Sequence, residues 1–187
     1  SADYGVAQTR QRFICVGVKK TMNNFEFPKQ THSDPKKPIK GTKNWVTCGD
    51  ILNDIDFDLP EDEKMKAGSK HKDLLPLIPP GENYLFFTKE RNHHNPVFKW
   101  RSRYWSFLLK LSPDRPSWTI QASHSNNMGP FHWKNRFLRI DEIKRIQSFK
   151  REHIFLGSFK EQWRQVGNAV PPKLSKVIAA EIINQYY

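Results

Sequence analysis

The chain has 187 residues, enough for one large domain or two small ones with a buried core. Its 31 Lys and Arg residues outnumber 19 Asp and Glu residues, and the formal net charge of +12 favours an anionic polymer, nucleic acid first, as partner. The sequence contains no apolar run long enough to cross a membrane, no signal-peptide pattern and only two cysteines, without a Cys-x-x-Cys pair. We therefore expect no membrane partner, no disulfide framework and no metal site, in a reducing cytoplasm.

The N-terminal residues combine a polar cluster with an apolar run. In Gln8-Thr9-Arg10-Gln11-Arg12, the side chains of Gln8, Arg10 and Arg12 share one face if the segment is extended. This face is either a solvated strand end or a set of donors for phosphate or base, and we favour the donors. Residues 13–18 form an apolar run that predicts a strand buried on both faces of an α/β sheet. No βαβ repeat surrounds this run, so we expect its sheet to come from polypeptide preceding Ser1.

A basic connector and a short ordered segment come next. Residues 19–43 are rich in Pro, Lys, Thr and Asn, which is typical of a mobile linker. Residues 45–52 predict the start of a helix capped near Gly49 or Asp50. Residues 54–72 are acidic and then basic, which indicates a solvent-exposed loop or helix without chemistry.

The middle of the chain predicts a small β-rich module. Residues 84–88, 105–111 and 117–120 have strand-like sequences separated by Pro, Gly and Asn breakers. Residues 99–105 interleave cations with aromatic side chains, which suits nucleic-acid binding but also an exposed edge strand protected by its charges. Residues 122–129 form a Ser- and Asn-rich loop that either reads base edges or is a plain connection.

The last third predicts two helices with a turn between them. Residues 136–149 carry Ile143, Ile146 and Phe149 at helical spacing. The Gly-Asn and Pro-Pro pairs in residues 164–172 predict a tight turn with positive φ at Gly167 that opens a C-terminal helix. The backbone N–H groups of such a turn suit the carboxylate of a small ligand, although spacing alone is equally typical of a plain loop.

Three of these segments together resemble the DNA cytosine-5 methyltransferases. Residues 8–12 fit the family's Gln-x-Arg-x-Arg motif, and residues 165–172 (Gln-Val-Gly-Asn-Ala-Val-Pro-Pro) resemble its last signature motif. Between them, residues 116–120 resemble a Pro-Ser-x-Thr-Ile stretch. The family's penultimate motif is matched in register by Arg136, Leu138, Glu142, Arg145, Gln147 and Phe149. Arg139 replaces the usual Thr, so the helix start is expected to shift to Asp141, and Lys150 replaces the usual Pro.

The resemblance implies an α/β fragment with four regions. It would be part of a Rossmann-like methyltransferase domain, with one core strand and the C-terminal helix, plus a small β-rich target recognition domain. Residues 1–20 would be the end of the catalytic domain, and residues 21–73 would be the connector to the recognition domain. Residues 74–150 would form the recognition domain with the penultimate motif, and residues 151–187 would return to the catalytic domain.

The resemblance also assigns site residues. Gln8, Arg10 and Arg12 would lie near the target base and the DNA backbone, as catalytic residues. Gly167, Asn168 and Ala169 would help to bind S-adenosyl-L-methionine, which polypeptide outside this chain would mainly hold. DNA contacts are expected from Lys99, Arg101, Arg103, Ser123, Asn126, Asn127 and Arg136.

The family's reactive groups are missing from this sequence. The reaction needs a thiolate from a Pro-Cys pair to attack a flipped cytosine in duplex DNA, an acid from Glu-Asn-Val, and a Gly-rich cofactor loop. None occurs here, and we expect Cys15 and Cys48 to be packing residues, so the chain alone is predicted to be inactive. It would be the C-terminal portion of a bacterial restriction–modification enzyme, with the N-terminal half in cis, or the recognition subunit of a split one. The alternative is a non-catalytic DNA-binding module.

Overall fold

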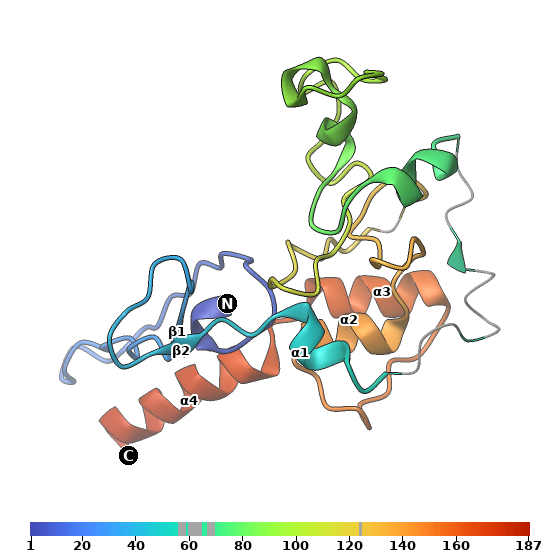
Figure 1. Cartoon of the computed structure of the whole chain (residues 1–187). Coiled ribbons are helices and arrows are strands. Elements are labelled where there is room, and N and C mark those ends of the chain that lie inside the picture. Colours follow the sequence, from blue (N-terminus) through green and yellow to red (C-terminus); the bar gives the residue numbers. More distant parts are fainter. Residues whose placement is uncertain (56–58, 60–64, 67–69, 124) are drawn as a thin grey trace.

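Helices carry most of the regular structure of this chain (Figure 1). The computed structural model describes residues 1–55, 59, 65–66, 70–123 and 125–187. Most of the acidic-then-basic stretch and His124 therefore lie outside the described residues. The regular elements in chain order are η1 (Ala2–Tyr4), β1 (His32–Ser33), β2 (Lys43–Asn44), α1 (Cys48–Leu52), η3 (Lys72–Leu77), η4 (Tyr84–Phe87), η5 (Lys89–Arg91), α2 (Ile140–Ile146), α3 (Phe159–Asn168) and α4 (Pro172–Tyr186).

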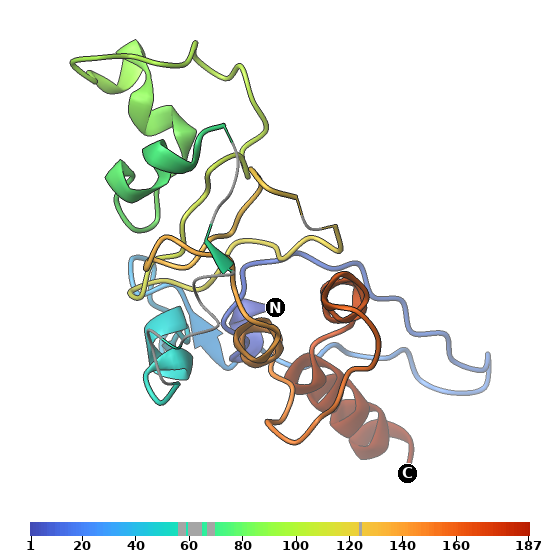
Figure 2. The same cartoon turned by 90° about the vertical axis from the view of Figure 1, so that its right-hand side faces the viewer.

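The elements fall into three groups in space (Figures 1 and 2). Helix α2 packs against both α1 and α3, while α4 runs away from this group and contacts η1. The short parallel pair β1–β2 lies beside η1, and η3 to η5 stand above the other helices as a separate lobe. The chain is thus mixed α/β with a very small sheet, and none of its described helices is both long and apolar enough to span a bilayer.

The apolar run at residues 13–18 does not form the buried strand that its sequence predicts. The Phe13 side chain is 94% exposed, and burial alternates along the run between partly buried and exposed residues. Among the residues that the structure describes, β1 and β2 are the only strands, and they pair with each other. The run is therefore extended without a sheet, because an apolar strand is buried only where neighbouring strands and helices cover it.

The connector at residues 19–43 is more ordered than its composition predicts. It contains β1 and lies along the end of α4, where the Tyr186 hydroxyl donates to the Asn23 carbonyl at 2.9 Å. The Gln185 amide donates to the Glu26 carbonyl at 2.8 Å and accepts from the Glu26 N–H at 3.0 Å. These contacts join the connector to the C-terminal helix.

The predicted strands of the middle region are not formed in the described residues. Residues 84–87 form the 3₁₀ helix η4, whose first turn is capped because the Asn83 side chain accepts from the Leu85 N–H at 3.1 Å. In residues 105–111 the backbone makes only single-residue bridges, and Leu108 has a φ of 51°. A positive φ interrupts an extended ladder, so the run turns instead of pairing.

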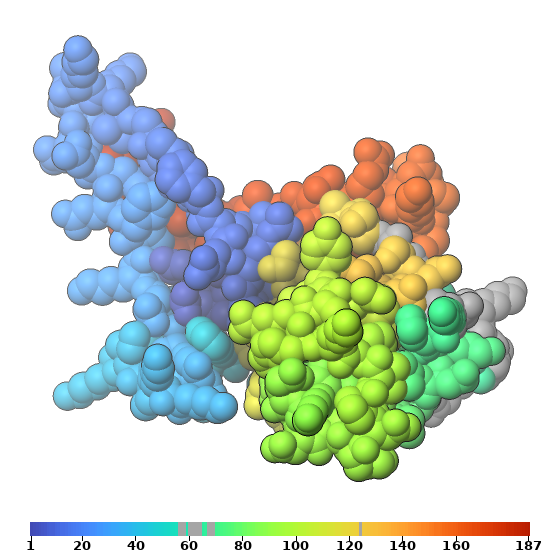
Figure 3. Space-filling model, turned by 90° about the horizontal axis from the view of Figure 1, so that it is seen from above, coloured from blue at the N-terminus to red at the C-terminus, as the bar shows by residue number. Residues whose placement is uncertain are grey.

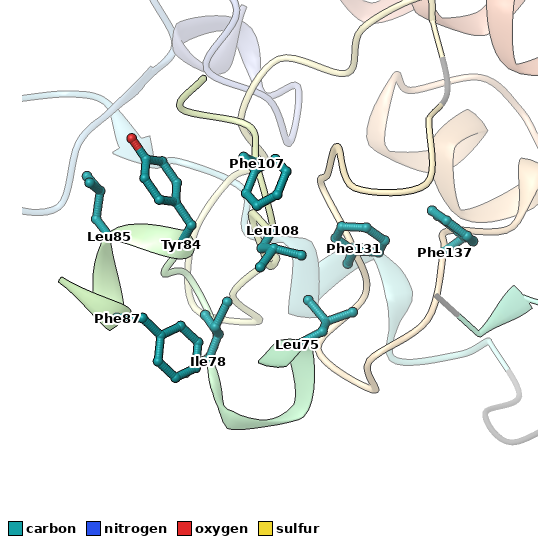
Figure 4. Close-up of a cluster of buried hydrophobic side chains, with 9 residues drawn as sticks. All are labelled: Leu75, Ile78, Tyr84, Leu85, Phe87, Phe107, Leu108, Phe131 and Phe137. Carbon is teal, nitrogen blue, oxygen red and sulfur yellow. The ribbon is translucent and has the colours of Figure 1, made fainter. Parts of the chain in front are cut away.

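A core of aromatic and aliphatic side chains holds this irregular lobe together (Figure 4). The rings of Tyr84 and Phe107 meet edge to face with centroids 5.9 Å apart, and Phe131 and Phe137 lie 5.0 Å apart. Burial of these rings, rather than a β ladder, stabilises the lobe. The cluster consists of Leu75, Ile78, Tyr84, Leu85, Phe87, Phe107, Leu108, Phe131 and Phe137.

The helices around α2 form a second core, of which the sequence predicts α1 and α2 but not α3, whose last residues it predicts to form a turn. Leu52 of α1, Ile143 of α2 and Trp163 of α3 are buried in this core. Helix α1 begins after Thr47, whose hydroxyl accepts from the Asp50 N–H, so the cap is Thr47 and not Gly49 or Asp50. Helix α2 begins at Ile140, one residue before the expected Asp141.

A buried ion pair fixes the start of α2. Two nitrogens of Arg136 donate to the Glu142 carboxylate, with Nη1–Oε2 at 2.9 Å and Nη2–Oε1 at 2.7 Å. Both side chains are almost fully buried, and Glu142 also accepts from the Arg139 N–H at 2.8 Å. The carboxylate thus binds the backbone N–H of the residue that precedes α2, the position where the family's usual Thr would have capped the helix.

Replacing Glu142 by Gln tests this pair. The variant leaves the buried Arg136 charge without its carboxylate, so we expect the free energy of unfolding to fall by about 3–5 kcal/mol in denaturant titrations. The matched control is Glu152→Gln, because Glu152 forms an exposed pair with Lys150 at 3.8 Å and its loss should leave stability nearly unchanged. Equal stability of both variants would contradict the anchoring role.

Candidate functional site

The two ends of the chain meet through a pair of arginine side chains. Arg10 Nη1 donates to the Gly167 carbonyl at 2.8 Å, and Arg12 Nη2 donates to the Ala169 carbonyl at 2.7 Å. Burial, and then the neighbouring Arg10 charge, lower the pKa of Arg12. The exposed Asn168 lies between the two accepting residues. The polar cluster at residues 8–12 and the last motif therefore form one site, although 157 residues separate each bonded pair.

The backbone of the last motif differs from the predicted turn. Gly167 and Asn168 are the last residues of α3, and Gly167 is not among the glycines with positive φ. The turn comprises residues 169–171, and α4 begins at Pro172, as the Pro pair predicts. The Ala169 N–H bonds within α3 and the Lys173 N–H donates to the Ser148 hydroxyl at 3.1 Å, while the two arginines meet carbonyl oxygens of the motif.

Gly167 is required for close packing rather than for a bend. A Cβ at this position would lie 2.8 Å from both the Ala122 Cα and the Gln121 carbonyl oxygen. The Trp163 Nε1–H donates to the same Gln121 carbonyl at 2.8 Å. Helix α3 therefore lies directly against the residues that lead into the polar loop at 122–129.

Gln8 lies behind the two arginines and not at the surface. It is fully buried, its backbone bridges Ser117, and its amide nitrogen and oxygen have no hydrogen-bond partner among the residues described. Of the three residues expected near a base, Arg10 and Arg12 are partly exposed, whereas Gln8 does not reach solvent. The alternation of the motif places all three on one face, but at different depths.

The two segments expected to contact DNA also come together. Residues 99–105 are held from below, because the Tyr84 hydroxyl donates to the Arg103 carbonyl at 2.8 Å and the Asn83 amide to the Trp105 carbonyl at 2.8 Å. The polar loop joins them through the Gly129 N–H, which donates to the Ser106 carbonyl at 2.8 Å. Figure 3 shows this lobe projecting from the rest of the molecule.

Most side chains proposed for DNA contact are accessible, with one exception. The exposed ones are Lys99, Arg101, Arg103, Ser123 and Asn126, and Asn127 is partly exposed. The Arg101 guanidinium lies over the Trp100 ring at 5.4 Å. Arg136 is only 3% exposed and paired with Glu142, so its guanidinium is not available at the surface and we leave it out of the interface.

The two cysteines differ in environment. Burial raises the pKa of Cys48 to about 12, so its thiol stays protonated and unreactive in the core, as expected of a packing residue. Cys15 is exposed, so the expectation that it packs is wrong. The cause is the missing sheet around residues 13–18.

Sequence reasoning included Trp105 in residues 99–105 but gave no role to Trp118, which lies between the two DNA-contact segments. Trp105 and Trp118 meet at a centroid distance of 5.4 Å and line a surface cavity together with Met128. Trp118 lies within the Pro-Ser-x-Thr-Ile-like stretch. The sequence signal that could have pointed to it is an aromatic side chain at the position that this motif leaves variable. Only the fold brings it next to Trp105.

The comparisons with known proteins identify the family. The model of C-5 cytosine-specific DNA methylases matches residues 1–184. The chain belongs to this family. It is 40% identical over 99% of its length to the Type II methyltransferase M.SacI of Streptomyces achromogenes, covering 50% of that protein. It is 31% identical over 97% of its length to the Type II methyltransferase M.NgoFVII of Neisseria gonorrhoeae, covering 47% of that protein.

This C-5 cytosine-specific DNA methylase chain thus spans about half the length of the curated relatives it matches. Type II methyltransferases belong to restriction–modification systems, and the family transfers methyl groups from S-adenosyl-L-methionine to DNA.

The close contact at Gly167 predicts that Gly167→Ala lowers the stability of the protein, whereas a Gly-to-Ala change in a helix usually raises it. Helix propensity alone favours Gly167→Ala by about 1 kcal/mol. Because the added methyl meets backbone at 2.8 Å, we expect a net loss of stability of about 1–3 kcal/mol instead, measured by chemical unfolding. Gly17→Ala is the matched control, since nothing lies within 4 Å of a Cβ there and stability should hardly change. A stabilised Gly167→Ala protein would show that the helix does not press on Ala122.

Proposed function

We propose that this chain is the DNA-recognition and cofactor-closing portion of an S-adenosyl-L-methionine-dependent DNA cytosine-5 methyltransferase. The observation that carries the proposal is the pairing of Arg10 and Arg12 with the carbonyls on either side of Asn168. Two sequence motifs at opposite ends of the chain share one surface, as a common site for target base and cofactor requires. The nucleophilic Cys would belong to the part of the enzyme that the chain does not include.

The recognition role rests on the lobe above the helices. It presents Lys99, Arg101 and Arg103 beside a loop with Ser123 and Asn126, and all five are exposed. Cations neutralise phosphates, and amide and hydroxyl groups read base edges in a groove. The substrate would be double-stranded DNA with its target cytosine rotated out of the helix.

The cofactor role rests on Asn168. Its side chain is exposed at the end of α3 and forms no hydrogen bond to another described residue, so its amide can serve a polar ligand. S-adenosyl-L-methionine, when bound, supplies the methyl group. Within this chain Asn168 would hold one edge of the cofactor, with Gly167 and Ala169 setting its position.

How the missing half is supplied remains part of the proposal. The family's Pro-Cys, Glu-Asn-Val and Gly-rich motifs are not in this sequence. We place them in an N-terminal half of the same polypeptide, and a separate catalytic subunit is the second arrangement. Either way, this chain alone would bind DNA without transferring a methyl group.

A non-catalytic DNA-binding module is the second candidate. The net charge of +12 and the exposed cations of residues 99–103 favour it independently of any motif. It requires strong salt dependence of DNA binding and gives Asn168 no function. The cofactor site therefore separates the two candidates.

Methyl transfer and cofactor binding test the proposal together. We expect the complete protein to transfer labelled methyl groups to cytosine C5 in duplex DNA, and this chain alone to transfer none. Asn168→Ala should weaken S-adenosyl-L-methionine binding about fivefold, which corresponds to about 1 kcal/mol for one lost hydrogen bond, in calorimetric titrations. Asn53→Ala is the matched control, because Asn53 is an exposed residue at the end of α1. Equal affinities of the two variants would remove the cofactor role.

Arg101 and Arg103 test the recognition surface. If one of them contacts a base, its replacement by Ala should cost about 1–3 kcal/mol on the preferred duplex and relax preference at one base pair. If it contacts phosphate, binding should weaken on all duplexes alike and the salt dependence should become shallower. Unchanged binding by both variants, measured against Arg151→Ala as the charge control, would show that the surface is misplaced.

A further inference from the structure

The lobe has a cavity of about 440 Å³ between the two DNA-contact segments, to which the proposed function gives no role. Its walls are mostly apolar and include three aromatic rings. The side chains of Tyr104, Trp105 and Trp118 are 81%, 48% and 42% exposed, although aromatic rings of this size are usually well buried. A volume in this range suits a small-molecule-sized group rather than a single methyl.

Both DNA-contact segments contribute to this cavity. Tyr104 and Trp105 belong to the first segment and Met128 to the second, and the two are tied together by a bridge between Phe107 and Met128. Leu109 is almost completely buried where it lines the cavity. Met128 packs against the lobe core of Figure 4, so the lining is anchored to that core on the side of the second segment.

The surroundings of the cavity select an occupant attached to a polyanion. None of the described residues that line it carries a charge, while the residues just before Tyr104 include the exposed cations Arg101 and Arg103. A neutral, flat group linked to phosphates satisfies both features. Nucleobases have this character, and base-to-aromatic stacking contributes about 1–3 kcal/mol per base.

We infer that this cavity binds one nucleobase of the recognition sequence, other than the methylated cytosine, after it has left the helical stack. Inside a duplex the base faces are covered by their neighbours, so only an unstacked base can place its face on one of the two indole rings. Because the rings of Trp105 and Trp118 stand at 69° to each other, the second ring would meet the edge of that base. Stacking of about 1–3 kcal/mol offsets much of the cost of a few kcal/mol for opening a base pair. The exposed amide of Gln121 lines the cavity and is suited to the edge of the same base.

The inference rests on the proposed DNA substrate, and its experiment begins with the complete protein. A preferred duplex is selected from a randomised library, and the methylated cytosine is located in it. Binding of the wild-type protein and of Trp118→Ala is then measured on duplexes in which each other nucleotide is made abasic in turn. We expect Trp118→Ala to weaken binding about 5- to 150-fold on intact DNA, which corresponds to about 1–3 kcal/mol. This loss should vanish on the duplex that is abasic at one position and persist at all others.

A mismatch at that position separates an unstacked base from one contacted in the groove. Since pairing no longer has to be broken, the wild-type protein should bind the mismatched duplex more tightly, and Trp118→Ala should gain less. Trp118→Phe should retain the wild-type pattern because it keeps an aromatic face. Tyr187→Ala is the matched control, since Tyr187 is an exposed aromatic residue outside the lobe that does not line the cavity.

Tyr104→Ala provides a second variant should Trp118→Ala fail to fold, because the Tyr104 ring is 81% exposed and contributes little to the core. It should show the same dependence on one abasic position. A uniform loss on every duplex, or no gain from the mismatch, would overturn the inference. If the wild-type protein methylates DNA but the binding loss of neither variant depends on one abasic position, only the inference about the cavity is refuted. If the wild-type protein transfers no methyl group, the proposed function is refuted.

Discussion

Two guanidinium groups close this chain on itself. Arg10 and Arg12 donate to the carbonyls of Gly167 and Ala169, and no other described contact joins the N-terminal polar cluster to the last motif as directly. A charged donor to a backbone carbonyl contributes about 1.5–3 kcal/mol when it is shielded from water. The arrangement fixes the start of α4 relative to the N-terminal segment. It also leaves Asn168 exposed between two bonded carbonyls, the position that the proposed function gives to one edge of the cofactor.

Helix α3 connects this closure to the lobe that contains η3 to η5. On one side its final carbonyls meet the arginines, and on another Gly167 and Trp163 press against residues 121–122. The Gln147 amide at the end of α2 donates to the Val166 carbonyl at 3.0 Å, so the penultimate motif reaches the same helix. Three motifs far apart in sequence therefore meet on ten residues, Phe159–Asn168. A shift of α3 would therefore change the contacts of the arginine pair and those of residues 121–122, which precede the polar loop, at the same time.

The lobe itself shows how irregular backbone can be held rigid. Its segments lack a β ladder, and turns such as Arg101 and Leu108 have positive φ. Side chains replace the ladder: Asn83 and Tyr84 bond the carbonyls of the cation-rich segment, and a ring cluster fills the space beneath. Such a scaffold leaves all seven consecutive residues 99–105 exposed, whereas in a strand covered on one face every second side chain would be buried.

The sequence by itself determined three properties of this protein. Three motifs in order determined the family, composition determined the basic character of the surface, and local periodicity and spacing determined the helices α2 and α4. Only the tertiary structure decided that Arg136 is buried against Glu142, that residues 13–18 stay unpaired, and that Gly167 serves close packing instead of a bend. It alone brought Trp118 to Trp105. The reason is physical: a side chain's burial and its partners are set by residues distant in the chain, and local pattern does not record them.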